Sequence, residues 1–292
     1  MIANEGHDNW ITVTILLAKR AGYIVTERAG ISLSQYRLLL RLLAANNDNG
    51  QTAKALSEEL GLSPSSVTSA LNDLESLGAA QRREDGRDRR VVRVSITDSG
   101  ANLIAKVDPA LCQLAHEFWS VYDDNELAMT KRDSASTVLE RRLGYMKIDG
   151  ISVENAYIDS SLVTLASLNA HMRRANISLN EYRVLHLLSR YEQGLRVKDL
   201  SRRLLLRSNE VCVAASKLEE HGRLERVKLP SDRRATCFTI TERGTEKLRK
   251  MTPAIIDSLQ NDITELSENA FDLYDSIANK ILAQYRQSHL LE

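Results

Sequence analysis

Glycine and proline are scarce in this chain of 292 residues, which contains only 13 glycines and 4 prolines. Together they fall far below the roughly 12% of residues that is usual, which excludes collagen-like, low-complexity and turn-rich β proteins. Hydrophobic residues make up 43% of the chain, enough to build a buried core. We therefore expect a globular protein that is mainly α-helical.

Cysteine and long apolar runs are also scarce. The three cysteines, Cys112, Cys212 and Cys237, contain no Cys-x-x-Cys pair, which excludes a four-cysteine zinc site and favours a reducing compartment. The longest uncharged apolar run, residues 11–18, is far shorter than the roughly 18 residues needed to span a bilayer. No basic segment followed by an apolar core opens the chain, so no secretory signal is predicted. We expect a cytoplasmic protein that does not contact membranes.

Net charge is absent, because 39 Lys and Arg residues balance 39 Asp and Glu residues. This excludes a polycation that binds nucleic acid through its overall charge, so any basic surface has to be local. The phosphate-binding pattern Gly-x₄-Gly-Lys, the nucleophile elbow Gly-x-Ser-x-Gly and the zinc motif His-Glu-x-x-His are all missing. The sequence predicts neither an enzyme nor a cofactor.

What the chain does contain is a repeat of itself. Residues 31–43 match residues 177–189 at a spacing of 146, and from Leu56 onward the spacing settles at 144. At that spacing Asp88-Arg89-Arg90 falls on Asp232-Arg233-Arg234, and Ile96-Thr97 falls on Ile240-Thr241. We interpret the chain as one domain duplicated, with residues 1–149 as the first copy and residues 150–292 as the second.

Each copy changes its periodicity in the same order. In the first copy, Ser34 is expected to cap a helix with leucines at three- and four-residue steps, and Thr52 to cap a short helix that closes at Gly61. Ser63-Pro64 is a strong start signal for a third helix, which runs to Gly78. Two short helices are thus joined by a tight turn.

A charged β-hairpin and two longer helices are predicted to follow. Val92, Val94 and Ile96 alternate with polar residues after a turn at Gly86. Thr97 is expected to cap a long helix, and a further helix runs from about 125 to 142; the second copy repeats these helices at about 241–263 and 267–286. Helix, helix, turn, helix and basic hairpin is the order of a winged helix-turn-helix, whose third helix enters the major groove of DNA.

Two stretches resemble the MarR family of bacterial transcriptional regulators. They are SPSSVTSALNDLESLG at residues 63–78 and GRDRRVVRVSITDSG at residues 86–100, the second being similar to the family's wing motif. The resemblance implies a mainly α protein with small β-hairpin wings, in which two winged helix-turn-helix domains share a helical dimerisation-like core. Because the family's members are usually dimers of shorter chains, it also implies that this tandem chain forms a pseudo-dimer by itself.

Polar and basic residues mark the expected DNA contacts of the first copy. The third helix offers small hydrogen-bonding side chains near its amino terminus, namely Ser65, Ser66, Thr68, Ser69 and Asn72. The hairpin carries six arginines against three acidic residues between positions 82 and 93, and Arg82, Arg87, Arg89 and Arg90 are the predicted contacts. The resemblance assigns insertion into the minor groove to Arg89 or Arg90, and in the second copy to Arg233 or Arg234.

The second copy diverges at the positions that would face DNA. Arg207 replaces the capping serine, and Glu210, Cys212 and Val213 stand where polar groups are expected. Its remaining candidate contacts are Ser208, Asn209 and Lys217. Cys212 is a possible thiol switch, although a lone cysteine is more often a small buried hydrophobe. A metal site near Cys112 and His116 is disfavoured, because His116 and Glu117 are adjacent on a helix and face different directions.

Two functions remain open from the sequence. One is a DNA-binding transcriptional repressor, a single-chain pseudo-dimer that reads an asymmetric operator in double-stranded DNA and responds to a small phenolic or aromatic effector. The other is a winged-helix module for protein–protein interaction whose second copy no longer reads DNA. A steep salt dependence of DNA binding would favour the first, since each neutralised phosphate releases counterions.

Overall fold

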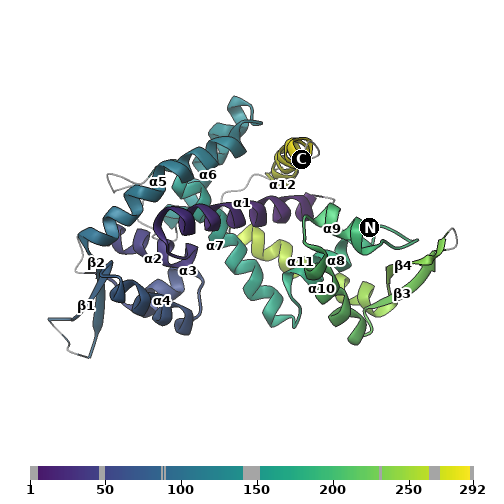
Figure 1. The fold of residues 1–292 in the computed structure, drawn as a ribbon, viewed down its shortest axis with the longest axis horizontal. Helices are drawn as coiled ribbons and strands as arrows, with labels where there is room; N and C mark the ends of the chain where they lie inside the picture. The colour runs from purple at the N-terminus through teal and green to yellow at the C-terminus, as the bar shows by residue number, and fades with distance from the viewer. Residues whose placement is uncertain are drawn as a thin grey trace.

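The computed structural model describes residues 6–45, 50–86, 88, 90–140, 152–229, 232–262 and 270–289. Helices dominate, and two short hairpins lie at opposite ends of the elongated molecule (Figure 1). Residues 1–149 are called the first half below, and residues 150–292 the second half. No helix in the described part of the chain is long and apolar enough to cross a membrane.

The two halves contain the same elements in the same order. The first half has α1 (Gly6–Ala29), α2 (Leu33–Ala44), α3 (Ala53–Leu60), α4 (Pro64–Ser76), β1 (Ala80–Glu84), β2 (Val92–Ile96), α5 (Asp98–Trp119) and α6 (Asp124–Glu140). The second half has α7 (Val153–Arg174), α8 (Leu179–Leu188), α9 (Val197–Leu204), α10 (Ser208–Glu220), β3 (Leu224–Leu229), β4 (Asp232–Ile240), α11 (Glu242–Asp262) and α12 (Ala270–His289). The bounds of α3 and α9, and those of α4 and α10, differ by 144 residues. The predicted tandem repeat and fold class are confirmed.

Most of the expected helix starts are confirmed, and one is wrong. The hydroxyls of Thr52, Ser63 and Thr97 each accept a main-chain N–H three residues later. However, α2 is capped by Ser32 rather than Ser34. The Ser32 hydroxyl accepts the Gln35 N–H at 3.2 Å, while the Gln35 side chain accepts the Ser32 N–H at 2.7 Å. This reciprocal capping box satisfies two main-chain donors, which Ser34, already inside the helix, cannot do.

Both hairpins are fixed to their domains in the same way. β1 pairs antiparallel with β2, and β3 with β4. In the first half, an isolated antiparallel β-bridge pairs Gln51 with Val94 of the hairpin. In the second half, the equivalent bridge pairs Leu195 with Phe238. A Cβ at Gly100, just after β2, would lie 2.2 Å from the Ala79 carbonyl oxygen, so only glycine allows this helix start to pack against the hairpin.

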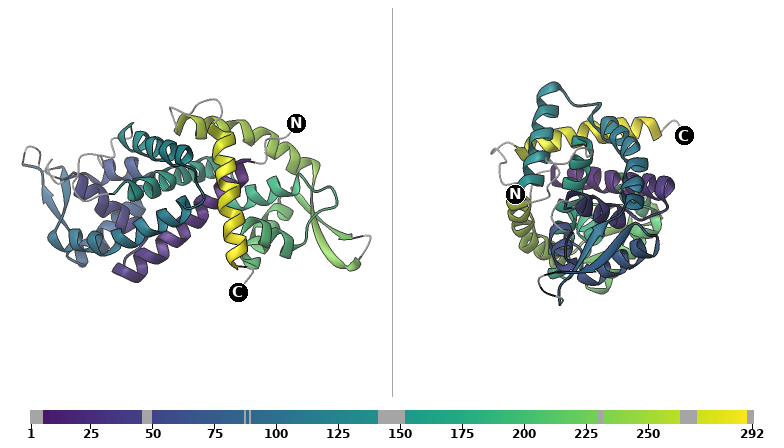
Figure 2. Two further views of the ribbon diagram at one scale, coloured as in Figure 1. Left: turned by 90° about the horizontal axis from the view of Figure 1, so that it is seen from above. Right: turned by 90° about the vertical axis from the view of Figure 1, so that its left-hand side faces the viewer.

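The two hydrophobic cores exchange helices between the halves. The first core combines α1–α5 with residues of the second half, including Ile158 and Leu162 of α7 and Ile277 and Ile281 of α12. Conversely, Ile11 of α1 belongs to the second core. α12 crosses and packs against α1 (Figures 1 and 2), and α6 packs against α7. The long helix α5 of the first half also packs against α7 of the second half.

Buried polar contacts also join the halves. Asp159 of α7 accepts hydrogen bonds from Arg37 at 2.8 Å and Arg41 at 2.5 Å, both on α2. Burial alone would raise the pKa of Asp159, but the two guanidinium groups outweigh it and hold that pKa below its usual range. In the second half, Arg183 of α8 donates to the Thr12 hydroxyl of α1 at 2.5 Å.

Candidate nucleic-acid interface

Helix α4 has one buried face and one exposed polar face. Val67, Ala70, Leu71 and Leu74 are buried against the first core. The five predicted DNA contacts, Ser65, Ser66, Thr68, Ser69 and Asn72, are all exposed. This separation follows from the helical period, which places positions three and four residues apart on the same side. The exposed face is thus available to an external ligand.

The amino terminus of α4 concentrates hydroxyl groups. Ser63 caps the helix by accepting the Ser66 N–H at 3.1 Å, and its hydroxyl also lies 2.7 Å from that of Ser66. Thr68 donates its proton to the Pro64 carbonyl at 2.9 Å, which leaves its oxygen as an acceptor. The free N–H groups and the dipole of a helix amino terminus favour phosphate oxygens.

Arg82, predicted to contact DNA, connects the hairpin to α4. Its guanidinium donates to the Glu75 carboxylate and to the Asn72 side-chain oxygen, both at 2.7 Å. The second half repeats the arrangement, since Arg226 donates to Glu219 at 3.0 Å. The structure therefore brings together two of the predicted contacts, Arg82 and Asn72. Sequence reasoning missed this contact, although Glu75 lies at the same repeat position as Glu219.

The hairpin tip is only partly described. Arg90 is exposed, and its main-chain N–H donates to the Asp88 carboxylate at 2.9 Å. Arg93 is held by Asp85 and does not extend freely into solvent. Arg87 and Arg89 lie outside the described residues, and although Arg233 and Arg234 belong to β4, their side chains lie outside the description too.

Helix α10 exposes a different set of groups. Ser208, Asn209, Cys212 and Lys217 are exposed, and Val213 is 60% exposed. Without a capping hydroxyl, the Glu210 carboxylate accepts the Arg207 N–H at 2.8 Å, and this main-chain hydrogen bond holds the pKa of Glu210 below its usual range. A negative charge thus occupies the helix end where α4 has serines.

The three cysteines differ in their surroundings. Cys212 is exposed, Cys237 is buried and Cys112 is half-buried beside the Ser152 hydroxyl at 3.0 Å. Burial raises the pKa of the Cys112 thiol. Within the described ranges, no group of three or more His, Cys, Asp and Glu side chains could hold a metal ion. The thiol switch at Cys212 stays a prediction.

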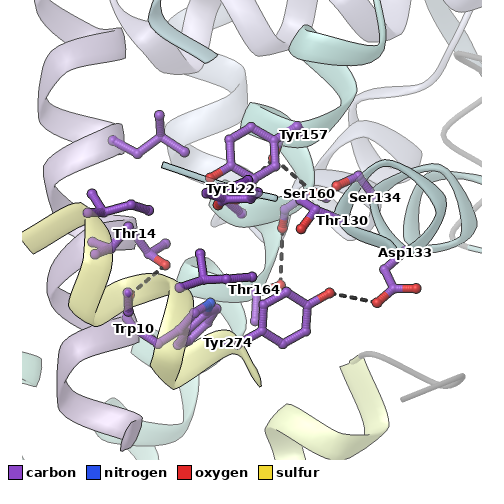
Figure 3. Close-up of a pocket in the computed structure, with 16 residues that line it drawn as sticks. Trp10, Thr14, Tyr122, Thr130, Asp133, Ser134, Tyr157, Ser160, Thr164 and Tyr274 are labelled. Atoms are coloured by element: carbon purple, nitrogen blue, oxygen red, sulfur yellow. Dashed lines mark hydrogen bonds between the residues drawn. The ribbon is translucent and has the colours of Figure 1, made fainter. Parts of the chain in front are cut away.

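Sequence reasoning missed a cavity that lies between α1, α6, α7 and α12 (Figure 3). Trp10, Asp133, Tyr157 and Tyr274 are among the residues that line it. No pattern in the sequence marks these positions, because they come from four helices whose pairing depends on the whole fold.

Comparisons with known proteins agree with the arrangement of helices and wings. The model of the MarR family matches residues 29–91 and again residues 175–235. The transcriptional repressor MprA of Escherichia coli (strain K12) is 29% identical over 128 residues, covering 43% of this chain and 69% of MprA. The regulator MhqR of Bacillus subtilis (strain 168) is 28% identical over 123 residues, covering 42% of this chain and 83% of MhqR.

Among solved structures, the MarR-family regulator Sco3205 from Streptomyces coelicolor, in complex with DNA, is 24% identical. That match covers 45% of this chain and 87% of Sco3205, with a TM-score of 0.41. The two matched segments lie at the spacing of the internal repeat, and each coincides with a winged helix-turn-helix unit of the structure. Together these observations establish the family. The chain belongs to the MarR family of DNA-binding transcriptional regulators and carries the family's DNA-binding segment twice.

Proposed function

We propose that this chain is a cytoplasmic repressor that acts as a single-chain pseudo-dimer. Residues 1–149 form one MarR-like winged helix-turn-helix domain and residues 150–292 a second, diverged one, so that each half takes the place of a subunit. The exchange of α1 and α7 between the two cores supports this proposal, because it is the kind of intertwined contact that joins subunits of a dimer.

The observation that carries the proposal is the presence of two exposed reading helices in one chain. α4 and α10 both lie along the lower edge of the molecule in Figure 1, and the two hairpins point outward beyond them. Dimeric helix-turn-helix proteins place their reading helices about one turn of DNA apart, roughly 34 Å. A single chain would thus cover both halves of one operator.

The two half-sites differ in this proposal. The hydroxyls of Ser65, Ser66 and Ser69 reach phosphate oxygens and base edges from α4, with Arg90 following the backbone from the wing. On α10 the exposed Val213 suits a thymine methyl group, whereas Glu210 repels nearby phosphate. The operator is therefore asymmetric, with its stronger half-site under α4.

Binding to the DNA upstream of the chain's own gene tests this function. A gel-shift titration is expected to give one chain per duplex, with log affinity falling steeply as log salt concentration rises. Sedimentation of the complex provides the stoichiometry independently. Two chains per operator would overturn the pseudo-dimer, and binding without salt dependence would favour the protein-interaction alternative.

The halves are also expected to depend on each other for folding. Residues 1–149 expressed alone should aggregate or self-dimerise, because Ile11 and the apolar faces of α1 and α5 lose their partners on α7 and α12. Analytical ultracentrifugation of this fragment decides the matter. A stable monomeric half would contradict the proposal.

A further inference from the structure

The short helix α9, which precedes the second reading helix, carries a dense group of cations. Between positions 196 and 207 the chain has five basic residues and one acidic residue. The five are Arg196, Lys198, Arg202, Arg203 and Arg207, all of them exposed, and they are called the basic surface of α9 below. Because the whole chain is neutral, such a cluster marks a local surface for an anionic partner.

The corresponding helix of the first half has the opposite charge. At the repeat spacing of 144, Arg202 corresponds to Glu58 and Arg203 to Glu59. α3 keeps one basic residue, Lys54, and its charge faces that of Glu58 at 3.9 Å. The same helix is thus acidic in one half and basic in the other. Two identical subunits could not differ in this way, so the difference belongs to the fused chain.

Carboxylates neutralise little of the basic surface. Asp199 lies 3.6 Å from Arg202, but these side chains are 36% and 70% exposed, and ion pairs at such positions are weak. Arg203 lies over the ring of Tyr191 at 4.9 Å, a contact that uses no carboxylate. Within the described part of the chain, Lys198 forms no ion pair. Most of the positive charge therefore stays available to a partner.

The basic surface lies between two elements of the candidate DNA interface. Leu195, directly before its first residue, pairs with Phe238 of the hairpin strand β4. Arg207, its last residue, directly precedes Ser208 at the start of α10. In a helix-turn-helix the first helix crosses the DNA backbone while the second enters the major groove. α9 is thus the element of the second half that is expected to meet phosphates.

The one carboxylate at the start of α10 is balanced from two sides. Glu210 lies 3.3 Å from Arg207 and 3.8 Å from Lys19, which reaches it from α1 of the first half. These two cations reduce the repulsion between Glu210 and phosphate. The carboxylate therefore does not cancel the charge of the neighbouring α9.

We propose that the basic surface of α9 binds DNA phosphates and supplies the larger share of the affinity that does not depend on sequence. The inference rests on the proposed function, in which both halves lie on one operator, and deepens it by giving the halves different roles. The first half reads the sequence with the hydroxyls of α4, whereas the second half holds the backbone. The acidic α3 makes no comparable contribution.

DNA binding at several salt concentrations tests these roles. Lys198→Ala with Arg202→Ala removes two cations four residues apart on one side of α9. This α9 variant should bind the DNA upstream of the chain's own gene and an unrelated duplex more weakly by the same factor. The slope of log affinity against log salt should fall by roughly one to two units, since each phosphate contact contributes about 0.9.

A matched control removes the same charge elsewhere. Arg249→Ala with Lys250→Ala changes two exposed cations of α11, both paired with Glu246. This α11 variant should leave the slope unchanged, because α11 lies outside the helix-turn-helix.

A gain of binding provides an independent test on the other half. Glu58→Arg gives α3 the residue that α9 has at the same repeat position. It should raise the affinity for both duplexes and increase the salt slope by roughly one unit. Glu58→Gln removes the charge without adding a phosphate contact and should raise the affinity less. Because this variant changes a different helix, it also decides the matter if the α9 variant fails to fold.

The outcomes separate this inference from the proposed function. An unchanged slope in the α9 variant, or an equal fall in the α11 variant, would overturn the phosphate-binding surface and favour an acidic protein as its partner. A loss confined to the upstream DNA would also overturn it, because α9 would then read sequence. Two chains per duplex with the expected slopes would overturn the pseudo-dimer and support the phosphate contacts. A chain that binds neither duplex would overturn both.

Discussion

Arg37 and Asp159 form a buried ion pair of 2.8 Å between helices of the two halves, and Arg41 approaches the same carboxylate from one turn further along α2. The Asp159 side chain is only 2% exposed. Removing one partner of a buried pair leaves the remaining charge without compensation, at a cost of about 3–5 kcal/mol. This contact therefore makes the junction of the halves sensitive to a single substitution.

Asp159→Asn is expected to lower the free energy of unfolding by about 3–5 kcal/mol, because two arginines then stay buried beside a neutral amide. Urea denaturation followed by circular dichroism measures the change. Glu58→Gln, at an exposed position on α3, provides the control and should change stability by less than about 0.5 kcal/mol. Equal stabilities of the two variants would show that the pair contributes no net stability.

Arg82→Ala is expected to weaken DNA binding without changing its dependence on salt. Glu75 and Asn72 already engage the guanidinium, which connects the wing to α4. If this is its main role, Arg82 neutralises no phosphate and the slope stays the same. Gel shifts at several salt concentrations give the slope. Arg83→Ala is the comparison, because Arg83 is exposed and donates to Gln81 at 3.2 Å. A smaller slope for Arg82→Ala would make Arg82 a direct phosphate contact.

Replacing Arg89 and Arg90 together by alanine should weaken binding to all DNA sequences. If both side chains touch phosphate or the minor groove, the slope of log affinity against log salt should fall by roughly one to two units. The measurement compares an operator with an unrelated duplex. An unchanged slope would remove the wing tip from the interface.

The divergence between α4 and α10 predicts unequal half-sites. Ser69→Ala with Asn72→Ala should abolish sequence preference, while Cys212→Ser with Lys217→Ala should mainly lower overall affinity, because α10 offers fewer groups for base reading. Footprints of the two variants on one promoter compare both half-sites directly. An equal loss of preference in the two halves would mean that the divergence of α10 has no functional effect.

Local signals allowed much of the fold to be predicted from the sequence. The hairpins and most of the helix starts depend on residues a few positions apart, such as Ser63 with Pro64. The repeat supplied some of these signals twice, as with the capping residues Thr97 and Thr241. The error at Ser34 has a local cause as well. Ser32 and Gln35 have the spacing of a capping box, and this pattern could have located the true start of α2.

Contacts between the halves could not be predicted in this way. Arg37 and Asp159 are 122 residues apart, and the repeat does not preserve the pair. In the second half, the corresponding Arg183 donates to the Thr12 hydroxyl and to the Leu204 carbonyl. A comparison of the two copies therefore carries no signal for this contact. The cavity could not be predicted from the sequence for the same reason, since the residues that line it come from helices far apart in the chain.

The exchange of helices between the cores has a consequence for synthesis on the ribosome. Ile277 and Ile281 of α12 belong to the first core, although they follow it by more than a hundred residues. At a translation rate of about 5–20 residues per second, the first core waits many seconds for its last helix. Its apolar surface stays exposed during that interval, so the nascent chain is a natural substrate for a chaperone until α12 emerges.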